Sequence, residues 1–216
     1  MKISAVIFDL NGTLVDDIAF HYEAWKWLAD REGFVMNPAI FQSCNGLKNE
    51  DIFPRLLGRP VHAAELSTLG EAKETRYREL YLPQLAALAG AEAFFVRLRV
   101  AGVKLAVASS APIENRAMVL EGLAWTKTFD AVVASEGLRG KPEPDIFLAA
   151  AAQLGVTPTE CLVFEDAVNG VRAARAANMQ VIAVTTNVSP SELVAAGAMR
   201  TVADFLASSH GLVASA

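Results

Sequence analysis

Five short apolar runs recur along this chain and constrain its fold more than any other feature. The first covers residues 3–8 and stops at the polar turn Asp9-Leu10-Asn11-Gly12. A short apolar run that ends in a tight turn is typical of a buried strand in a parallel sheet. We expect strands at the other four runs too, which cover residues 103–108, 131–134, 162–164 and 181–184.

Helical patterns fill the gaps between these runs. They cover residues 92–100, 114–123, 145–154, 170–177 and 191–196, and Pro144 and Pro190 stand near helix starts. Strands that alternate with helices predict an α/β fold, a doubly wound parallel sheet with helices on both faces.

Residues 17–82 break this rhythm. They contain helical patterns near 18–32, 50–57 and 63–82 and no run of strand length. A crossover between parallel strands needs only about a dozen residues. We therefore expect an inserted α-helical cap domain at 17–82, carried by a core domain made of residues 1–16 and 83–216.

The composition narrows the class of protein. Hydrophobic residues make up 53% and the formal net charge is -5, so the chain has material for a core but little basis for binding nucleic acid or anionic membranes. The first apolar run is interrupted by Asp9 and Asn11, which is unlike a signal peptide or a membrane span. We expect a cytoplasmic protein. Cys44 and Cys161 lack metal-site spacing, and Cys161 is expected in the core.

Polar residues follow the predicted strands. Ligands of an open parallel sheet bind beyond the carboxyl ends of its strands, so these residues are expected to converge. They are Asp9 and Asn11 after the first strand, Ser109 and Ser110 after the second, Lys141 in the loop after the third, and Glu165 and Asp166 after the fourth.

This set of side chains suits phosphoryl transfer. Asp9 can attack phosphorus and form an aspartyl phosphate. Gly12 would let backbone N–H groups approach the phosphate, and Thr13 and Ser109 offer hydroxyl donors. Lys141 adds a positive charge. Each residue alone is commonly a cap or a solvated loop residue, so only the joint arrangement indicates a site.

Two adjacent carboxylates indicate a metal. Glu165 and Asp166 are expected close to Asp9, and three carboxylates in one place repel one another unless a hard cation lies among them. Mg²⁺ fits, because it binds through a few carboxylates together with substrate phosphate and water.

Four segments resemble the motifs of the haloacid dehalogenase superfamily. The likeness spans essentially the whole chain and is greatest to the β-phosphoglucomutase-like, CbbY-like group of sugar-phosphate phosphatases and mutases. The segments are Asp9-Leu10-Asn11-Gly12-Thr13-Leu14, Ala108-Ser109-Ser110, Gly140-Lys141-Pro142-Glu143-Pro144-Asp145 and Phe164-Glu165-Asp166-Ala167-Val168-Asn169-Gly170.

The resemblance implies a role for each residue. Asp9 would be the nucleophile, and Ser109 and Lys141 would hold the phosphoryl group. The Mg²⁺ ligands would be Asp9, Glu165, Asp166 and the backbone carbonyl of Asn11. The cap would close over a small phosphorylated metabolite, and we expect a monomer. The other substrate-binding residues expected are Gly12, Thr13, Ser110, His21, Trp25, Gly46, Lys48 and Asn49.

Asn11 departs from the family pattern, which has an Asp there as general acid and base. Asn has no proton to give at neutral pH, although it can donate a hydrogen bond. Three explanations stay open. Another residue, with His21 as the candidate, supplies the proton; the substitution traps a complex; or deamidation at Asn11-Gly12 restores an Asp.

Several activities compete. A mutase grips a second phosphate with an Arg after the glycine loop of the cap, but this chain has Asn45-Gly46-Leu47-Lys48-Asn49-Glu50. Lys48 lacks the bidentate fork of an Arg, which favours a phosphatase. A 2-haloacid dehalogenase needs no metal, so the carboxylate pair argues against it. A phosphate-binding protein without turnover is favoured by Asn11 alone.

Overall fold

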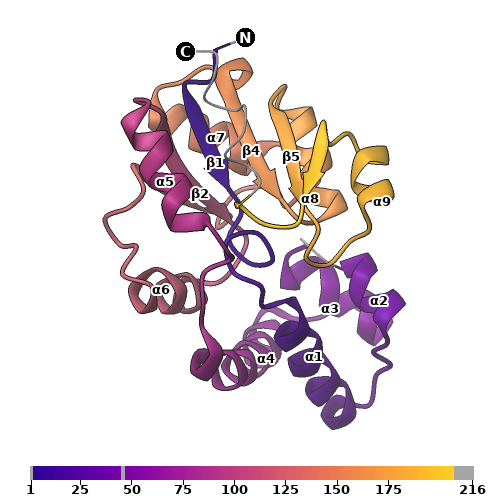
Figure 1. Ribbon diagram of the computed structural model, residues 1–216. Helices are drawn as coiled ribbons and strands as arrows, with labels where there is room; N and C mark the ends of the chain where they lie inside the picture. Colours follow the sequence, from indigo (N-terminus) through magenta and orange to yellow (C-terminus); the bar gives the residue numbers. More distant parts are fainter. Residues whose placement is uncertain (1, 45–46, 207–216) are drawn as a thin grey trace.

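The computed structural model describes residues 2–44 and 47–206 (Figure 1). Its centre is a parallel sheet of six strands in the order β3-β2-β1-β4-β5-β6, which confirms the predicted α/β class. The strands are β1 Ala5–Phe8, β2 Lys104–Ser109, β3 Ala131–Ala134, β4 Cys161–Glu165, β5 Gln180–Val184 and β6 Arg200–Val202.

Helices cover both faces of the sheet. Alternate residues of β1 point to opposite faces, so Ala5 and Ile7 join one hydrophobic cluster and Val6 and Phe8 join another. The first cluster includes residues of α7 (Asp145–Leu154), α8 (Val168–Ala176) and α9 (Pro190–Ala195). The second includes residues of α5 (Ala91–Val100) and α6 (Ile113–Gly122). This double layer buries the sheet and fixes the positions of the strand ends.

Four helices lie beyond the carboxyl ends of the strands (Figure 1). They are α1 Ile18–Glu32, α2 Pro38–Cys44, α3 Asn49–Leu57 and α4 Ala63–Tyr81. They share a hydrophobic cluster of their own around Trp25, Leu28, Phe41 and Phe53. We call these helices the cap, and the division at residues 17 and 82 remains our proposal.

One α-helix and one strand were not expected from the sequence. Helix α2 has seven residues, too few to show a clear helical period. Strand β6 has three residues at the edge of the sheet, and Arg200 in it is exposed, so it forms no apolar run. Cys161 is fully buried, as expected. Among the described helices, none has the length and apolar character needed to cross a membrane.

Candidate active site

The carboxyl ends of β1, β2 and β4 bring the central residues together. Asp9 follows β1 directly, Ser109 ends β2, and Glu165 ends β4. Lys141 comes from the loop after β3, and its ammonium donates to Asp9 Oδ1 at 2.6 Å and to Glu165 Oε1 at 2.5 Å. The lysine is only 3% exposed. A buried ammonium between two carboxylates therefore forms the floor of the site.

Burial and neighbouring charges shift the pKa values of these groups. Burial raises the pKa of Asp9 to about 7, although Lys141 acts in the opposite direction. Burial, then Glu165 and Asp9, raise the pKa of Asp166 well above its ordinary value. Burial alone would lower the pKa of Lys141, but Asp9 and Glu165 outweigh it and raise that pKa. Lys141 bonds to two of the three carboxyl groups, so three acidic groups lie beside a single ammonium and negative charge would be in excess if all three were ionised.

This excess suits a cation. Oxygen atoms of Asp9, Glu165 and Asp166 lie within 4.8 Å of one another. Asp166 Oδ2 is buried and has no hydrogen-bond partner among the described residues. An unpartnered carboxylate oxygen beside two other carboxylates fits a hard divalent cation such as Mg²⁺, and these residues could hold it.

The structure corrects the expectation that Gly12 and Thr13 face the phosphate. The N–H of Gly12 donates to Asp17 Oδ1 at 2.9 Å, and Thr13 Oγ1 donates to Asp166 Oδ1 at 3.1 Å. Neither residue lines the cavity. Gly12 has φ +77, and a Cβ there would lie 2.3 Å from Asp166 Oδ2. The tight turn after β1 therefore directs both residues away from the cavity. Gly12 leaves space for the Asp166 side chain, and Thr13 holds that side chain by a hydrogen bond.

Asp17 is a residue of the site that sequence reasoning missed. It is fully buried, and it accepts hydrogen bonds from the side chain of Asn11 and from Tyr77 Oη, the latter at 2.5 Å. Burial raises its pKa to about 6 despite these donors. From the sequence, an Asp just before a helix indicates an N-cap, but Asp17 makes no side-chain cap bond to α1.

His21 is unsuited to the role of replacement acid. Its Nδ1 lies 2.9 Å from Lys73 Nζ, and its ring stacks on Tyr77 with centroids 3.7 Å apart. An ammonium can only donate, so Nδ1 accepts and the ring is neutral. Burial and then Lys73 lower the pKa of His21 well below its ordinary value. The ring therefore carries no extra proton at neutral pH.

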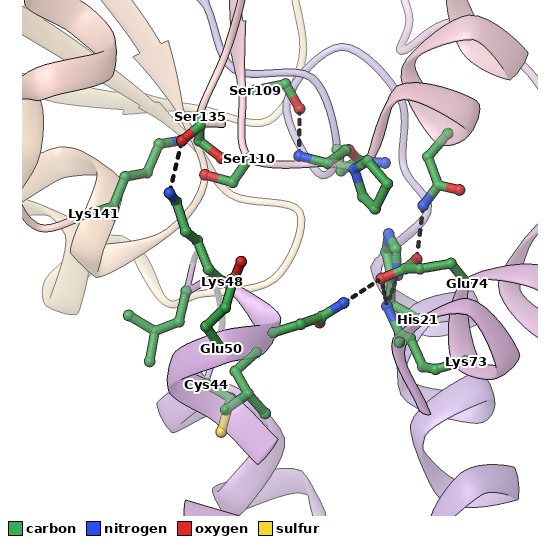
Figure 2. A pocket seen from close by; sticks show the side chains of 18 of the residues that line it. His21, Cys44, Lys48, Glu50, Lys73, Glu74, Ser109, Ser110, Ser135 and Lys141 are labelled. Carbon is green, nitrogen blue, oxygen red and sulfur yellow. Dashed lines mark hydrogen bonds and ion pairs between the residues drawn. The ribbon is translucent and has the colours of Figure 1, made fainter. Parts of the chain in front are cut away.

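A cavity of about 570 Å³ lies between the sheet edge and the cap, within the size range of small-molecule sites. Asp9, Asn11, Ser109, Ser110 and Lys141 line its core end. Ser110 Oγ is buried and has no partner among the described residues, which leaves it available to a ligand. Figure 2 shows Ser109, Ser110 and Lys141 together with side chains from the cap.

The predicted cap residues are placed differently from one another. His21, Trp25, Lys48 and Asn49 all line the cavity. Trp25 is 3% exposed, and its ring centroid lies 5.0 Å from that of Phe53, which supports packing as its main role. Gly46 lies outside the described residues.

Lys48 lines the cavity, but its ammonium bonds to the core. Its ammonium donates to the backbone carbonyl of Ser135 at 2.6 Å and to that of Leu138 at 2.5 Å. Figure 2 shows the first of these bonds crossing from the cap to the loop after β3. The side chain that was expected to meet the substrate thus also joins cap to core.

Comparison with known proteins agrees with this geometry. Residues 3–178 match the family model of haloacid dehalogenase-like hydrolases. The chain belongs to this family. As a haloacid dehalogenase-like hydrolase it is 32% identical to β-phosphoglucomutase of Bacillus subtilis (strain 168), over 84% of this chain and 83% of that protein. It is 35% identical to hexitol phosphatase A of Escherichia coli (strain K12), over 85% of this chain and 84% of that protein.

The fold comparison points the same way. The crystal structure of β-phosphoglucomutase from Clostridium difficile superposes with a TM-score of 0.83 at 27% identity, covering 94% of this chain and 92% of that one. This haloacid dehalogenase-like hydrolase is therefore an enzyme of the phosphatase and phosphomutase kind.

Proposed function

We propose that this enzyme is a Mg²⁺-dependent phosphatase of a small phosphorylated metabolite, a sugar phosphate, and that it works through an aspartyl phosphate on Asp9. The observation that carries this proposal is the Asp9–Lys141–Glu165 bridge beside the unpartnered oxygen of Asp166. The bridge fixes a carboxylate as nucleophile, and the free oxygen offers a place for the metal.

The chemistry divides into two steps. A carboxylate oxygen of Asp9 attacks phosphorus, the bond from phosphorus to the sugar oxygen breaks, and that oxygen takes a proton from solvent water because Asn11 has none to give. Water then attacks the phosphorus of the aspartyl phosphate and loses a proton to solvent, which releases inorganic phosphate and restores the carboxylate. When bound, Mg²⁺ would neutralise charge on the phosphoryl oxygens. The residues that would hold it are Asp9, Glu165, Asp166 and the carbonyl of Asn11.

The serines and the lysine would steady the phosphoryl group. Ser109 Oγ accepts from the N–H of Ala111 at 3.1 Å, so its own proton is free to donate to a phosphoryl oxygen. Ser110 Oγ is also free among the described residues. Lys141 is already placed against Asp9 and would follow the charge as it moves from the carboxylate to the phosphoryl oxygens.

The charges of the cavity favour a phosphatase over a mutase. A mutase has to hold a bisphosphate at both ends. The described residues that line this cavity include three lysines and no arginine, namely Lys48, Lys73 and Lys141. They also include seven acidic residues: Asp9, Glu50, Glu71, Glu74, Glu136, Glu165 and Asp166. Such a surface accommodates one phosphate at the metal end and disfavours a second. The similarity to β-phosphoglucomutases keeps a mutase as the alternative.

The test is phosphate release from fructose 1-phosphate, glucose 1-phosphate, mannitol 1-phosphate and acetyl phosphate, with Mg²⁺ and with EDTA. We expect release only with Mg²⁺, and we expect Asp9→Asn to abolish it for every substrate. Asp16→Asn makes the same charge change at an exposed neighbour and is expected to leave release unchanged. Release that survives EDTA or Asp9→Asn would contradict the proposal.

A further inference from the structure

A second buried carboxylate lies in the cavity, away from the metal end. Glu74 and Lys73 project from α4 of the cap and are each 4% exposed, and Asn115 on α6 of the core is fully buried. All three line the cavity together with Asn49 of α3. We call these four residues the polar wall. Figure 2 shows Glu74 and Lys73 across the cavity from Lys48 and Lys141.

The hydrogen bonds of the polar wall hold the carboxyl group of Glu74 in one orientation. Arg78 Nη1 donates to Asn115 Oδ1 at 3.0 Å, and a guanidinium can only donate. The oxygen of Asn115 therefore faces Arg78, and its NH₂ group donates to Glu74 Oε2 at 2.7 Å. Lys73 donates to Glu74 Oε1 at 3.0 Å, and Asn49 approaches the same oxygen at 3.5 Å. Each of these three partners donates to Glu74, so its carboxyl oxygens act as acceptors in the polar wall.

We propose that Glu74 is a specificity-determining residue: its fixed carboxylate accepts a hydroxyl group of the substrate's unphosphorylated end and excludes a second phosphate from that end. This inference rests on the proposed phosphatase function and deepens it. A carboxylate offers about four acceptor positions, and three are occupied here. Oε2 has only one partner in the polar wall, so it can take one hydroxyl more.

The cation of the polar wall does not change this conclusion. Lys73 is already committed to Glu74, to the ring nitrogen of His21, and to the face of Trp25 at 5.3 Å. A second phosphate would have to displace Glu74 from its lysine or lie beside a buried like charge, and both are costly away from water. A neutral hydroxyl group neither displaces Glu74 nor repels it. The wall therefore selects a polyhydroxyl monophosphate.

The polar wall also depends on the position of the cap. Glu74 and Arg78 belong to the cap, whereas Asn115 belongs to the core. Asn115 can orient the Glu74 carboxylate only when α4 lies against α6. Selection at the unphosphorylated end is thus tied to the arrangement in which the cavity is covered.

The experiment compares ligands that differ only in the second phosphate. Isothermal titration calorimetry with Mg²⁺ would give the Kd of fructose 1-phosphate and fructose 1,6-bisphosphate, and of glucose 1-phosphate and glucose 1,6-bisphosphate. The protein carries Asp9→Asn so that binding is read without turnover. We expect the monophosphate to bind more tightly in at least one pair, and Glu74→Gln to shift that ratio at least about tenfold toward the bisphosphate. Both ligands are measured on one preparation, so the folded fraction cancels.

Two further variants separate charge from fold. Glu74→Asp keeps the charge and the pairing with Lys73 but shortens the side chain, so the ratio should persist while the monophosphate binds more weakly. Glu79→Gln removes the same charge at an exposed position of α4 and should change nothing.

Three results would overturn the assignment. They are equal binding of both members of each pair, a ratio that Glu74→Gln moves less than twofold, and no binding of either monophosphate. Failure of the proposed function is seen separately, as absence of phosphate release by the chain with Asp9 intact while the binding preference remains.

Discussion

At the scale of single residues, we expect Asn11 to limit the reaction. It lines the cavity beside Asp9, but its amide donates to Asp17 and to Tyr77 Oη and carries no transferable proton. Asn11→Asp would place a second carboxyl group beside that of Asp17. Two neighbouring carboxyl groups raise the pKa of one of them, which makes it a proton donor. We expect kcat for fructose 1-phosphate to rise about 10²–10⁴-fold, the usual size of general acid–base help.

The leaving group provides the internal control for this variant. Acetyl phosphate expels a stable acetate that needs no proton, so its kcat should change far less than that of fructose 1-phosphate. Steady-state rates of both substrates on both proteins are the measurement. Equal gains for the two substrates, or none for the sugar phosphate, would show that proton transfer does not limit turnover. Intact mass of the Asn11 chain would reveal any deamidation beforehand.

His21 gives the folded protein a pH dependence. Its pKa in the folded chain lies well below the ordinary 6.5 because burial and Lys73 disfavour the charged ring. Below pH 6.5 the unfolded chain therefore takes up a proton that the folded chain does not. The folded state loses about 1.4 kcal/mol per pH unit from this group as the pH falls further, until the folded pKa is reached.

A non-titrating side chain should remove that loss. At each pH we subtract the free energy of unfolding of His21→Gln from that of the wild type. We expect this difference to be about 1 kcal/mol smaller at pH 5.5 than at pH 8. Urea unfolding at both pH values measures it. A difference that stays the same at both pH values would refute the assignment.

At the scale of elements, α8 comes so close to the site that it tolerates only glycine at one position. A Cβ on Gly170 would lie 1.8 Å from Glu165 Oε1. The carboxylate cannot move aside freely, because Lys141 and the N–H of Ala167 hold its two oxygens. We expect Gly170→Ala to destabilise the fold by roughly 1–3 kcal/mol, as other overpacking changes do, and to weaken Mg²⁺ binding.

A second helical glycine serves as the matched control. A Cβ on Gly70 of α4 would meet only the side-chain nitrogen of Asn49, at 3.3 Å. Gly70→Ala should be neutral or stabilise the chain by up to about 1 kcal/mol, because Ala is the better helix former. Thermal unfolding with and without Mg²⁺ compares the two variants. If they behave alike, α8 does not constrain Glu165 in this way.

The same scale shows what could be predicted from the sequence. Strands β1 to β5 were located because strands buried on both faces form continuous apolar runs. Asp9, Lys141 and Glu165 were placed together because the carboxyl ends of parallel strands share one edge. Strand β6 and helix α2 are too short to carry a pattern.

The cap side of the site could not be predicted in this way. Asp17 reads as an N-cap, and Glu74 as one more charge on a polar helix. Their roles arise only when α1 and α4 pack together and α4 meets α6, so no local spacing encodes them.

At the scale of the whole molecule, cap and core are joined by two passing segments, by polar contacts and by apolar packing. The apolar packing places Ala24, Tyr77 and Tyr81 of the cap in the same hydrophobic cluster as residues of the core. The segments pair with each other, through a bridge between Val15 and Ala87 and a 2.8 Å bond from Leu88 N to the carbonyl of Leu14. Away from these two segments, Asn115 bonds to α4 on one side of the cavity, and Lys48 bonds to the loop after β3 on another.

Lys48 should therefore set how firmly the cap is held. Its two bonds to carbonyl oxygens are charge-assisted, and bonds of this kind contribute about 1.5–3 kcal/mol each when intact. Lys48→Met keeps the apolar stem and removes the donor. We expect hydrogen exchange of the backbone amides at 136–138 to accelerate about tenfold or more, with little change in the thermal midpoint, because neither hydrophobic core is touched.

A lysine that stays within its own helix supplies the comparison. Lys26 pairs with Glu23 of α1 and makes no described contact with the core, so Lys26→Met should leave exchange at 136–138 unchanged. Fructose 1-phosphate should restore slow exchange in Lys48→Met, because a ligand held by both the metal end and the polar wall would replace the lost connection. If exchange in Lys48→Met equals that of the wild type, the two bonds of Lys48 do not hold the cap.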